Sequence, residues 1–279
     1  MEACVYCGLT LSDWKEKGKI GCSHCVRFLG EEYTKFIPLQ AAEDWKPLPE
    51  FTSASLWEEW ETISLSERLE KIDSYRLPFT YRFRVARNPR NSIYPKQSGK
   101  TNRFLREFLE SSSASWEEDR TPSQKNTRIP DFGDRFPWNS GTLLAGDEDH
   151  IRWEYVTDSL LELNSILESD FLRKFWVRDR FDFLEGIGFV NSCPTNSGHG
   201  DKLSVSIPAK LAETGDLSGF RLPTDWGFYR EELKERLVFF RKNFGQNRKN
   251  SFFNLVSYLA LLVISGKDGT KASLPHNPF

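Results

Sequence analysis

The most informative residues of this chain are Asn191-Ser192-Cys193-Pro194-Thr195-Asn196-Ser197-Gly198-His199-Gly200. They follow an apolar run, precede a segment with the pattern of a strand, and contain the one cysteine outside an N-terminal group of four. Gly198 and Gly200 allow a backbone turn with positive φ, whose N–H groups can approach a bound anion. The pattern suits a phosphate or guanidinium transfer site, and it equally suits a plain turn with one buried cysteine.

Together with the next segment, this loop resembles the signature of the guanidino-group phosphotransferases, which include arginine and creatine kinases and the bacterial protein-arginine kinase. In that family a Cys-Pro-Thr-Asn-x-Gly-x-x loop leads into an Arg-Ala-Ser-Val strand. Here the segment from Lys202 to Ile207 follows at the family's spacing, with lysine in place of arginine. The resemblance implies that Cys193 lies beside the substrate guanidinium as a thiolate that orients the acceptor, and that Lys202 contacts phosphate.

Composition limits the class of protein. A chain of 279 residues with 38% hydrophobic residues is long enough for one substantial domain and a small module. The net charge of −2 provides no global field for nucleic acid or anionic lipid, so neither is an expected partner. The start of the chain lacks the pattern of a signal peptide, and its longest apolar run, Leu255 to Ile264, is about half the length that spans a bilayer. We therefore expect a soluble, cytoplasmic protein.

Four cysteines form two Cys-x-x-Cys pairs, separated by residues 8 to 21, and this spacing brings four thiolates to one zinc ion: Cys4, Cys7, Cys22 and Cys25. A redox pair is the alternative, but two matched pairs without a βαβ pattern favour structural zinc. Residues 1–37 also resemble a zinc module of the activator that partners the bacterial protein-arginine kinase, which implies an amphipathic helix from Val26 to Ile37. Residues 38–50 hold three prolines and are predicted to be a linker to a domain at 51–279.

The segment from Tyr81 to Asn88 alternates basic and apolar residues, as a strand with Arg82 and Arg84 on one face does. Paired guanidinium groups on a strand can clamp nucleotide phosphates, although such a pattern also occurs on solvated edges. The segment resembles the family's Ser-x-Arg-x-Arg-x-x-Arg-Asn motif, whose first two arginines hold ATP phosphates. Tyr81 stands in place of the serine.

The run from Leu143 to Arg152 reads as an apolar strand that leads into three acidic residues and an arginine. Such a cluster is either an exposed acidic turn or a site where a cation stabilises buried carboxylates. The run resembles the family's Asn-Glu-Glu-Asp-His-x-Arg motif, which implies that Glu148 contacts the substrate guanidinium and Arg152 contacts phosphate. Gly146 and Asp147 depart from that motif.

Near the C-terminus, the run from Leu237 to Asn247 resembles the family's apolar strand followed by Arg-Gly-x-x-Gly-Glu. The resemblance makes Arg241 a further phosphate ligand and places Gln246 where a second catalytic glutamate belongs. Glutamine cannot accept a proton as that base would. Apolar spacing predicts helices over Leu56–Ile72 and Val156–Phe171. Residues 96–140 are rich in polar residues and proline and are expected to form loops with one helix near Arg103–Glu110.

These motifs predict an α+β fold, an antiparallel sheet flanked by helices, with a small N-terminal four-cysteine zinc module. The first functional hypothesis is an ATP- and magnesium-dependent guanidino phosphotransferase that acts on arginine in proteins. The second is a weak or inactive pseudokinase, an adaptor in stress-linked proteolysis that binds nucleotide, phosphoarginine or a kinase partner. Gln246, Tyr81 and Gly146 favour the second hypothesis, so the sequence leaves enzymatic activity open. Nucleic-acid binding through the zinc module is disfavoured because the module lacks a basic face.

Overall fold

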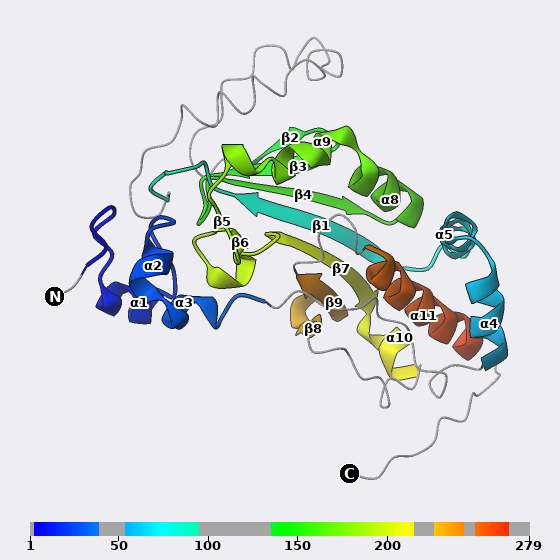
Figure 1. Cartoon of the computed structure of the whole chain (residues 1–279). Coiled ribbons are helices and arrows are strands. Elements are labelled where there is room, and N and C mark those ends of the chain that lie inside the picture. The colour runs from blue at the N-terminus through cyan, green and yellow to red at the C-terminus, as the bar shows by residue number, and fades with distance from the viewer. Residues whose placement is uncertain (1–2, 39–53, 95–134, 215–225, 243–248, 268–279) are drawn as a thin grey trace. The chain divides into compact units, whose positions relative to one another are not determined.

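The computed structural model describes residues 3–38, 54–94, 135–214, 226–242 and 249–267 (Figure 1). Three features predicted from the sequence lie outside this part of the chain: the linker from residue 39 onward, the helix at Arg103–Glu110, and Gln246. No helix within the described ranges has the length and apolar content needed to cross a bilayer.

The strands form one seven-stranded sheet in the order β2-β3-β4-β1-β7-β9-β8 and a separate pair, β5-β6. The large sheet contains β1 (Thr80–Arg87), β2 (Arg135–Trp138), β3 (Gly141–Ala145), β4 (Ile151–Thr157), β7 (Asp201–Pro208), β8 (Trp226–Glu231) and β9 (Arg236–Lys242). The small pair is β5 (Phe183–Leu184) and β6 (Gly188–Phe189). The β2–β3, β3–β4, β7–β9 and β8–β9 pairs are antiparallel. With its flanking helices, the sheet confirms the predicted α+β class.

The chain divides into two compact units. Unit 1 comprises Met1–Leu39, Arg84–Tyr155 and Ser169–Asp201. Unit 2 comprises Gln40–Phe83, Val156–Glu168 and Lys202–Phe279.

Unit 1 carries the N-terminal module and the strands that lead to the acidic turn. Its helices and 3-10 turns are α1 (Leu11–Lys17), α2 (Cys25–Leu29), α3 (Glu31–Thr34), α9 (Asp170–Arg173), η4 (Lys174–Trp176), η5 (Arg178–Arg180) and η6 (Pro194–Asn196). Four aromatic rings pack edge to face or tilted behind β2 to β4, with centroids 4.8–6.4 Å apart: Trp138, Trp153, Phe171 and Phe175. This cluster packs side chains of β2 and β4 against α9 and η4.

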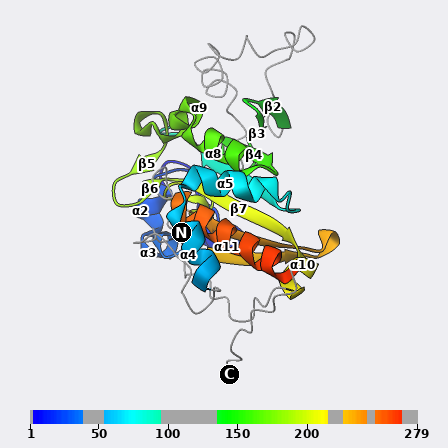
Figure 2. The same ribbon diagram turned by 90° about the vertical axis from the view of Figure 1, so that its right-hand side faces the viewer.

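Unit 2 is built from helices and the β7-β9-β8 strands. Its helical elements are α4 (Ala54–Thr62), α5 (Leu65–Ser74), α8 (Leu160–Glu168), α10 (Ala209–Thr214), η8 (Glu232–Lys234) and α11 (Lys249–Lys267). In Figure 2, α5 and α8 lie side by side, and α11 contacts both α4 and α5. Asp73 at the end of α5 accepts hydrogen bonds from the backbone N–H groups of Leu160 and Leu161, at 2.9 and 3.1 Å, and so caps the start of α8.

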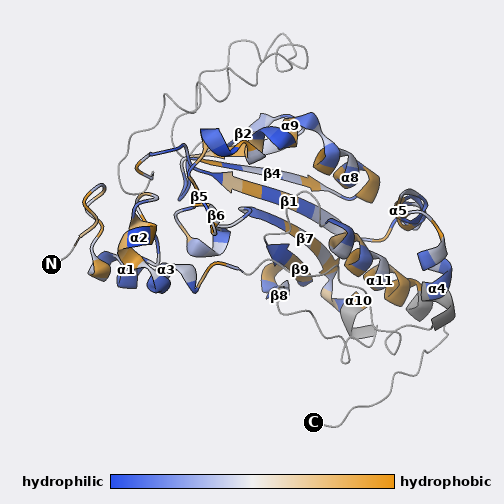
Figure 3. Cartoon of the chain, viewed as in Figure 1, coloured by the Kyte–Doolittle hydropathy of each residue, from blue (hydrophilic) through white to orange (hydrophobic). Residues whose placement is uncertain are grey.

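Strand β1 shows the predicted alternation. Tyr81, Phe83 and Val85 are buried, whereas Arg82 and Arg84 are half-buried. The bands of hydrophobic and hydrophilic colour along β1 in Figure 3 follow this period of two.

Three predicted helices have different bounds in the structure. The helix predicted over Leu56–Ile72 is two helices, because Ser64 caps the start of α5. The Ser64 side chain accepts a hydrogen bond from the Glu67 N–H at 3.2 Å, and the Glu67 carboxylate accepts one from the Ser64 N–H. The helix predicted from Val26 to Ile37 is split into α2 and α3 at Gly30, whose φ of 54° and ψ of −126° are not helical. The helix predicted over Val156–Phe171 begins only at Leu160, because residues 156 and 157 complete β4.

Candidate functional site

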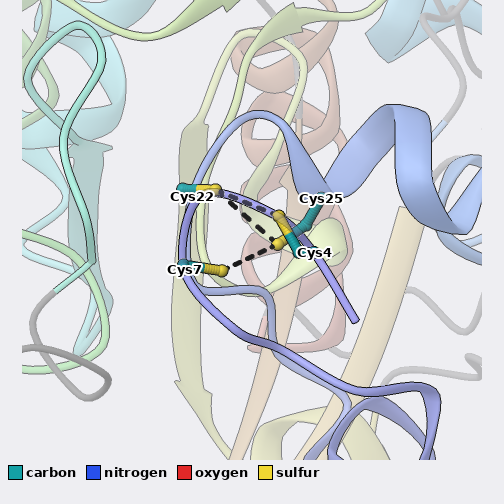
Figure 4. Close-up of side chains that lie close together, drawn as sticks. All are labelled: Cys4, Cys7, Cys22 and Cys25. Carbon is teal, nitrogen blue, oxygen red and sulfur yellow. Dashed lines mark hydrogen bonds between the residues drawn. The ribbon is translucent and has the colours of Figure 1, made fainter. Parts of the chain in front are cut away.

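The four N-terminal cysteines converge in unit 1 (Figure 4). All four sulfurs lie within 4.8 Å of one another, and the Cys7–Cys25, Cys4–Cys22 and Cys22–Cys25 Sγ separations are 3.3, 3.8 and 3.8 Å. Sulfurs bound to tetrahedral zinc at about 2.3 Å lie roughly 3.8 Å from each other. All five cysteines of the chain are free rather than paired in disulfides. The residues therefore fit a structural metal site.

Local sequence explains how the cysteines meet. The Gly8 N–H donates to the Cys4 carbonyl at 2.8 Å with φ of 76°, which closes the first knuckle. Thr10 and Asp13 form a capping box that starts α1, and Gly18 ends the helix in the left-handed conformation. The chain then returns through residues 19–21 to the second knuckle, where the Cys25 N–H donates to the Cys22 carbonyl at 3.1 Å.

The module is packed against the cysteine loop, residues 191–200. The Ile20 N–H donates to the Ser192 carbonyl at 2.9 Å, and the Ser192 hydroxyl donates to the Ile20 carbonyl at 3.1 Å. The buried Tyr33 hydroxyl donates to the Asn191 carbonyl at 2.9 Å and lies 2.6 Å from the Ser197 hydroxyl. The module's apolar core also includes Val190. The geometry of the N-terminal module and the geometry of the cysteine loop are consequently coupled within unit 1.

Glu148 lies in the turn between β3 and β4 and joins three other polar side chains. Its Oε1 accepts a hydrogen bond from Asn196 Nδ2 at 2.8 Å, and its Oε2 is paired with the Lys19 ammonium. Asn196 in turn accepts from Arg84 at 3.2 Å. The predicted guanidinium-binding carboxylate is therefore linked through the cysteine loop to one of the predicted phosphate arginines. Lys19 of the N-terminal module is the third partner.

A buried polar network lies beneath Glu148. The Asp149 carboxylate, 2% exposed, accepts from Asn88 Nδ2 and from the Ser192 N–H, both at 2.7 Å. The Asn88 oxygen accepts from the His150 N–H at 2.9 Å and lies 2.8 Å from His150 Nδ1. Because that oxygen can only accept, Nδ1 carries the hydrogen. The network joins β1, the acidic turn and the cysteine loop, and burial raises the pKa of the Asp149 carboxyl.

Cys193 is half-buried and belongs to the same loop as Asn196, the residue that donates to Glu148. Its sulfur lies 3.2 Å from the Thr195 hydroxyl. Gly198 and Gly200 have φ of 99° and 67°, as the sequence predicted. The Gly198 N–H, however, donates to the Phe189 carbonyl at 2.9 Å, so this amide holds the loop against β6 rather than facing an anion.

The remaining predicted phosphate ligands are found in both units. In unit 1, Arg152 forms a salt bridge of 3.0 Å with Asp147. Asp147 is one of the residues that depart from the family motif. In unit 2, the Lys202 ammonium lies 3.8 Å from the Phe240 ring centroid, and Arg241 is 1% exposed with its guanidinium 5.8 Å from the Trp226 ring. Arg82 is also assigned to unit 2. Their roles as phosphate ligands stay predictions.

The last residue of β1, Arg87, is an arginine with a structural role. Arg87 is fully buried, donates to the Phe175 carbonyl at 2.6 Å, and lies 3.8 Å from the Phe189 ring. Burial lowers the pKa of Arg87 to about 9. It anchors β1 to the segment that precedes the cysteine loop.

Two contact residues at Glu148 were not singled out from the sequence. Asn196 belongs to the quoted Cys-Pro-Thr-Asn loop, so the motif carried the signal although no role was assigned to it. No sequence signal indicated Lys19, because it is 129 positions away from Glu148 and belongs to the N-terminal module.

Acid should destabilise unit 1 through His150. Burial lowers the pKa of this histidine from 6.5 to about 3. Between those values the unfolded chain binds a proton that the native protein does not, so the free energy of unfolding decreases as the pH falls through this window. One such proton corresponds to about 1.4 kcal/mol per pH unit. Urea unfolding of the wild type and of His150→Gln, from pH 7 to pH 4, measures the difference.

We expect the wild type to lose stability more steeply than His150→Gln as the pH is lowered. The comparison with a variant is needed because Asp149 and Asp182, whose pKa values burial raises, act in the opposite direction. His199→Gln, which alters a half-buried histidine of the cysteine loop, is the control. Parallel curves for the wild type and His150→Gln would contradict the prediction.

Comparison with known proteins gives a consistent, partial picture. No protein-family model matches the chain. A protein-arginine kinase of Bacillus mycoides (strain KBAB4) is 31% identical over 68 residues, which are 24% of this chain and 19% of the relative. The match therefore spans less than a fifth of that curated relative's length.

Solved structures extend the similarity over most of the chain. A lombricine kinase aligns with a TM-score of 0.50 and 14% identity, covering 88% of this chain and 79% of the kinase. The substrate-free duplicated taurocyamine kinase from Schistosoma mansoni aligns with a TM-score of 0.54 and 13% identity, covering 93% of this chain and 43% of that protein. At these identities the likeness concerns architecture alone. The chain has the fold of the guanidino kinases, with a four-cysteine cluster at its N-terminus.

Proposed function

We propose that this protein is an ATP:guanidino phosphotransferase that acts on arginine side chains of proteins. One observation carries the proposal: Glu148 is joined through Asn196 to Arg84. This connection links the carboxylate suited to a guanidinium acceptor with an arginine suited to phosphate. Both hydrogen bonds lie within unit 1, and Cys193 belongs to the same loop as Asn196.

The chemistry of these side chains fits phosphoryl transfer. A carboxylate can hold a guanidinium through two hydrogen bonds and fix the orientation of its nitrogens. Transfer needs little covalent assistance, so positioning of the acceptor and neutralisation of phosphate charge supply most of the catalysis. In this proposal Glu148 and Cys193 orient the acceptor. The cationic residues that neutralise phosphate are Arg82, Arg84, Arg152, Lys202 and Arg241.

These cationic side chains would bind the phosphates of ATP, and the phosphates would carry the Mg²⁺ ion. Arg84 and Arg152 are half-buried, which suits binding of a phosphate group better than full exposure does. Mg²⁺, when bound with ATP, supplies further neutralisation of phosphate charge. A taurocyamine kinase structure of the same fold contains components of a transition-state analogue.

Two observations favour protein arginine as the acceptor. The curated relative is a protein-arginine kinase, and residues 1–37 resemble the zinc module of that kinase's activator. We propose that zinc fills the four-cysteine site and that kinase and activator elements are joined in one chain. We place the protein in the cytoplasm, where free thiols and zinc thiolates stay reduced.

A second function, in a different class, is favoured by the contact between Lys19 and Glu148. A carboxylate that already holds an ammonium group binds a substrate less readily. With Gln246 in place of a catalytic glutamate, the chain would then be a pseudokinase. It would act as an adaptor in stress-linked proteolysis that binds nucleotide, phosphoarginine or a kinase partner.

The test is ATP-dependent formation of phosphoarginine on an unfolded, arginine-rich protein. We expect the wild type to form it and Glu148→Gln and Cys193→Ala each to lose about 100-fold or more, the scale of losing one group that stabilises the transition state. Glu185→Gln, an exposed carboxylate of unit 1, should leave the rate unchanged.

Absence of phosphoarginine in the wild type would reject the enzymatic proposal. Titration with ATP then separates the remaining possibilities. Saturable ATP binding that Arg84→Ala weakens would support the adaptor, whereas absence of ATP binding would contradict both functions.

A further inference from the structure

We propose that Lys19 is a built-in competitor of the substrate guanidinium, which closes Glu148 until an arginine side chain displaces it. This inference rests on the proposed function, because it concerns regulation of the same site. It assigns to the zinc module a role that a purely structural metal domain would not have: presentation of a cation to the acceptor carboxylate.

The first support is the state of the Glu148 carboxylate. Its two oxygens have different partners, Lys19 on Oε2 and Asn196 on Oε1. The side chains of Glu148 and Lys19 are 15% and 28% exposed, so this pair is partly shielded from water. A guanidinium that binds this carboxylate through both oxygens must replace Lys19. A carboxylate oxygen has more than one lone pair, but the Lys19 ammonium would repel a second cation placed at Oε2.

The second support is the way in which Lys19 is held in place. It lies between Gly18, which ends α1, and Ile20, whose N–H and carbonyl both bond to Ser192. The next carbonyl, that of Gly21, accepts from the Tyr94 N–H at 2.7 Å. Cys22 follows directly and is one of the four clustered cysteines. These contacts of the residues that follow Lys19 therefore hold the backbone of Lys19 next to the cysteine loop.

The chemistry of the two cations makes the contact reversible by substrate. A lysine ammonium is a strongly hydrated point charge, whereas a guanidinium presents a planar fork that matches both oxygens of a carboxylate. A tethered group competes at an effective concentration on the order of millimolar. A free guanidinium thus binds more weakly than it would without Lys19, and an arginine with additional contacts to the protein displaces Lys19 more readily.

The first experiment measures the contact without any reference to activity. In the zinc-loaded full-length protein, Lys19 and Lys17 are labelled with an amine-reactive acetylating reagent and quantified by mass spectrometry. Lys17 is the matched control, since it is on the same module and pairs with Asp13 at 3.3 Å on an exposed surface. Lys19 should react several-fold more slowly than Lys17. Glu148→Gln should accelerate Lys19 alone, and equal Lys19 rates in the wild type and Glu148→Gln would overturn the inference.

The second experiment measures competition. N-acetylarginine amide is titrated by calorimetry into the wild type, Lys19→Ala, Lys19→Arg and Lys17→Ala. If Lys19 closes Glu148 in nine-tenths of the molecules, Lys19→Ala should bind the probe roughly tenfold more tightly. Lys17→Ala should match the wild type, and Lys19→Arg should bind no more tightly. Adding Glu148→Gln to Lys19→Ala should abolish the gain.

The outcomes separate this inference from the proposed function. Tighter binding by Lys19→Ala without phosphoarginine formation by any variant would retain the competitor and reject the enzyme. Phosphoarginine formation with equal probe binding by the wild type and Lys19→Ala would retain the enzyme and overturn the competitor. Failure of every variant to bind the probe would also overturn the competitor, while the phosphoarginine assay would decide the enzymatic proposal independently.

Discussion

Replacing Cys25 with serine should abolish zinc binding and unfold the N-terminal module. Cys25 is fully buried at the start of α2, and its sulfur lies near those of Cys7 and Cys22. The module is small, and cysteines make up part of its apolar core, so packing without a metal leaves little to oppose chain entropy. Structural zinc in comparable modules contributes roughly 10–16 kcal/mol of apparent binding free energy. We expect about one zinc per wild-type chain, and less than about half an equivalent in Cys25→Ser.

The loss should extend to the cysteine loop. The Ile20 N–H and the Tyr33 hydroxyl bond to Ser192 and Asn191, and both donors belong to the module. When the module unfolds, these hydrogen bonds are lost. The loop that carries Cys193 then keeps only its contacts outside the module, such as those to Asp149 and Phe189. Hydrogen exchange of the Ile20 amide in the wild type and in Cys25→Ser measures this effect. We expect strong protection in the wild type and loss of protection in the variant.

Cys193→Ser is the matched control, since it alters the remaining cysteine, which lies in the cysteine loop opposite the module. It should retain a full equivalent of zinc and normal protection of Ile20. Zinc retained by Cys25→Ser would refute the four-cysteine site. Zinc lost without any change in exchange would mean that packing alone holds the module to the loop.

The parts of the fold that could be predicted from the sequence are those with short-range patterns. The period-two alternation of Tyr81 to Val85 predicts the two faces of β1, and the two Cys-x-x-Cys pairs predict the four-cysteine cluster. Both patterns depend on local geometry that a few neighbouring residues impose. The cysteine loop was located in the same way, from its glycines and its resemblance to a family motif.

Helix ends were less predictable because single polar residues compete with apolar periodicity. The apolar spacing continues from α4 to α5, yet Ser64 and Glu67 exchange hydrogen bonds that start a new helix. Gly30 breaks the predicted helix of the module with a backbone conformation that its neighbours do not require. A serine three residues before a glutamate is a helix-start signal that the apolar period of Leu56–Ile72 obscures. A glycine within a helical pattern is a possible break, whereas the helix from Val26 to Ile37 is expected from resemblance to the activator's module.

The site contacts needed the folded chain. Glu148 and Arg84 were predicted from motifs, but the side chain between them, Asn196, is placed by the turn of the cysteine loop. Lys19 reaches Glu148 only because the N-terminal module folds against that loop. Such long-range polar contacts have no periodic signal, which is why sequence reasoning listed the charges of the site and missed their connections.

Replacing Asn88 with leucine should remove the link that holds Asp149, His150 and the cysteine loop together. Asn88 is 1% exposed, and its amide both donates to Asp149 and accepts from His150. Leucine has a similar volume, so the main effect is loss of hydrogen bonds to a buried carboxylate rather than a cavity. Breaking such a buried charged network costs about 3–5 kcal/mol. Urea unfolding at pH 7 measures the loss, and Asn164→Leu, which removes one half-buried hydrogen bond to Lys249 in unit 2, is the control.

A reciprocal exchange tests whether the loss arises from this one contact. Asn88→Asp alone places two carboxylates where Asn88 Nδ2 and Asp149 Oδ1 are now 2.7 Å apart, and the repulsion should destabilise the protein at pH 7. That destabilisation should diminish in acid, because a shared proton relieves the repulsion. Adding Asp149→Asn restores one donor and one acceptor across the contact, so the double variant should recover roughly 1–3 kcal/mol of coupling energy. Additive effects of the two substitutions would show that the contact between Asn88 and Asp149 contributes no coupling energy, which would contradict the prediction.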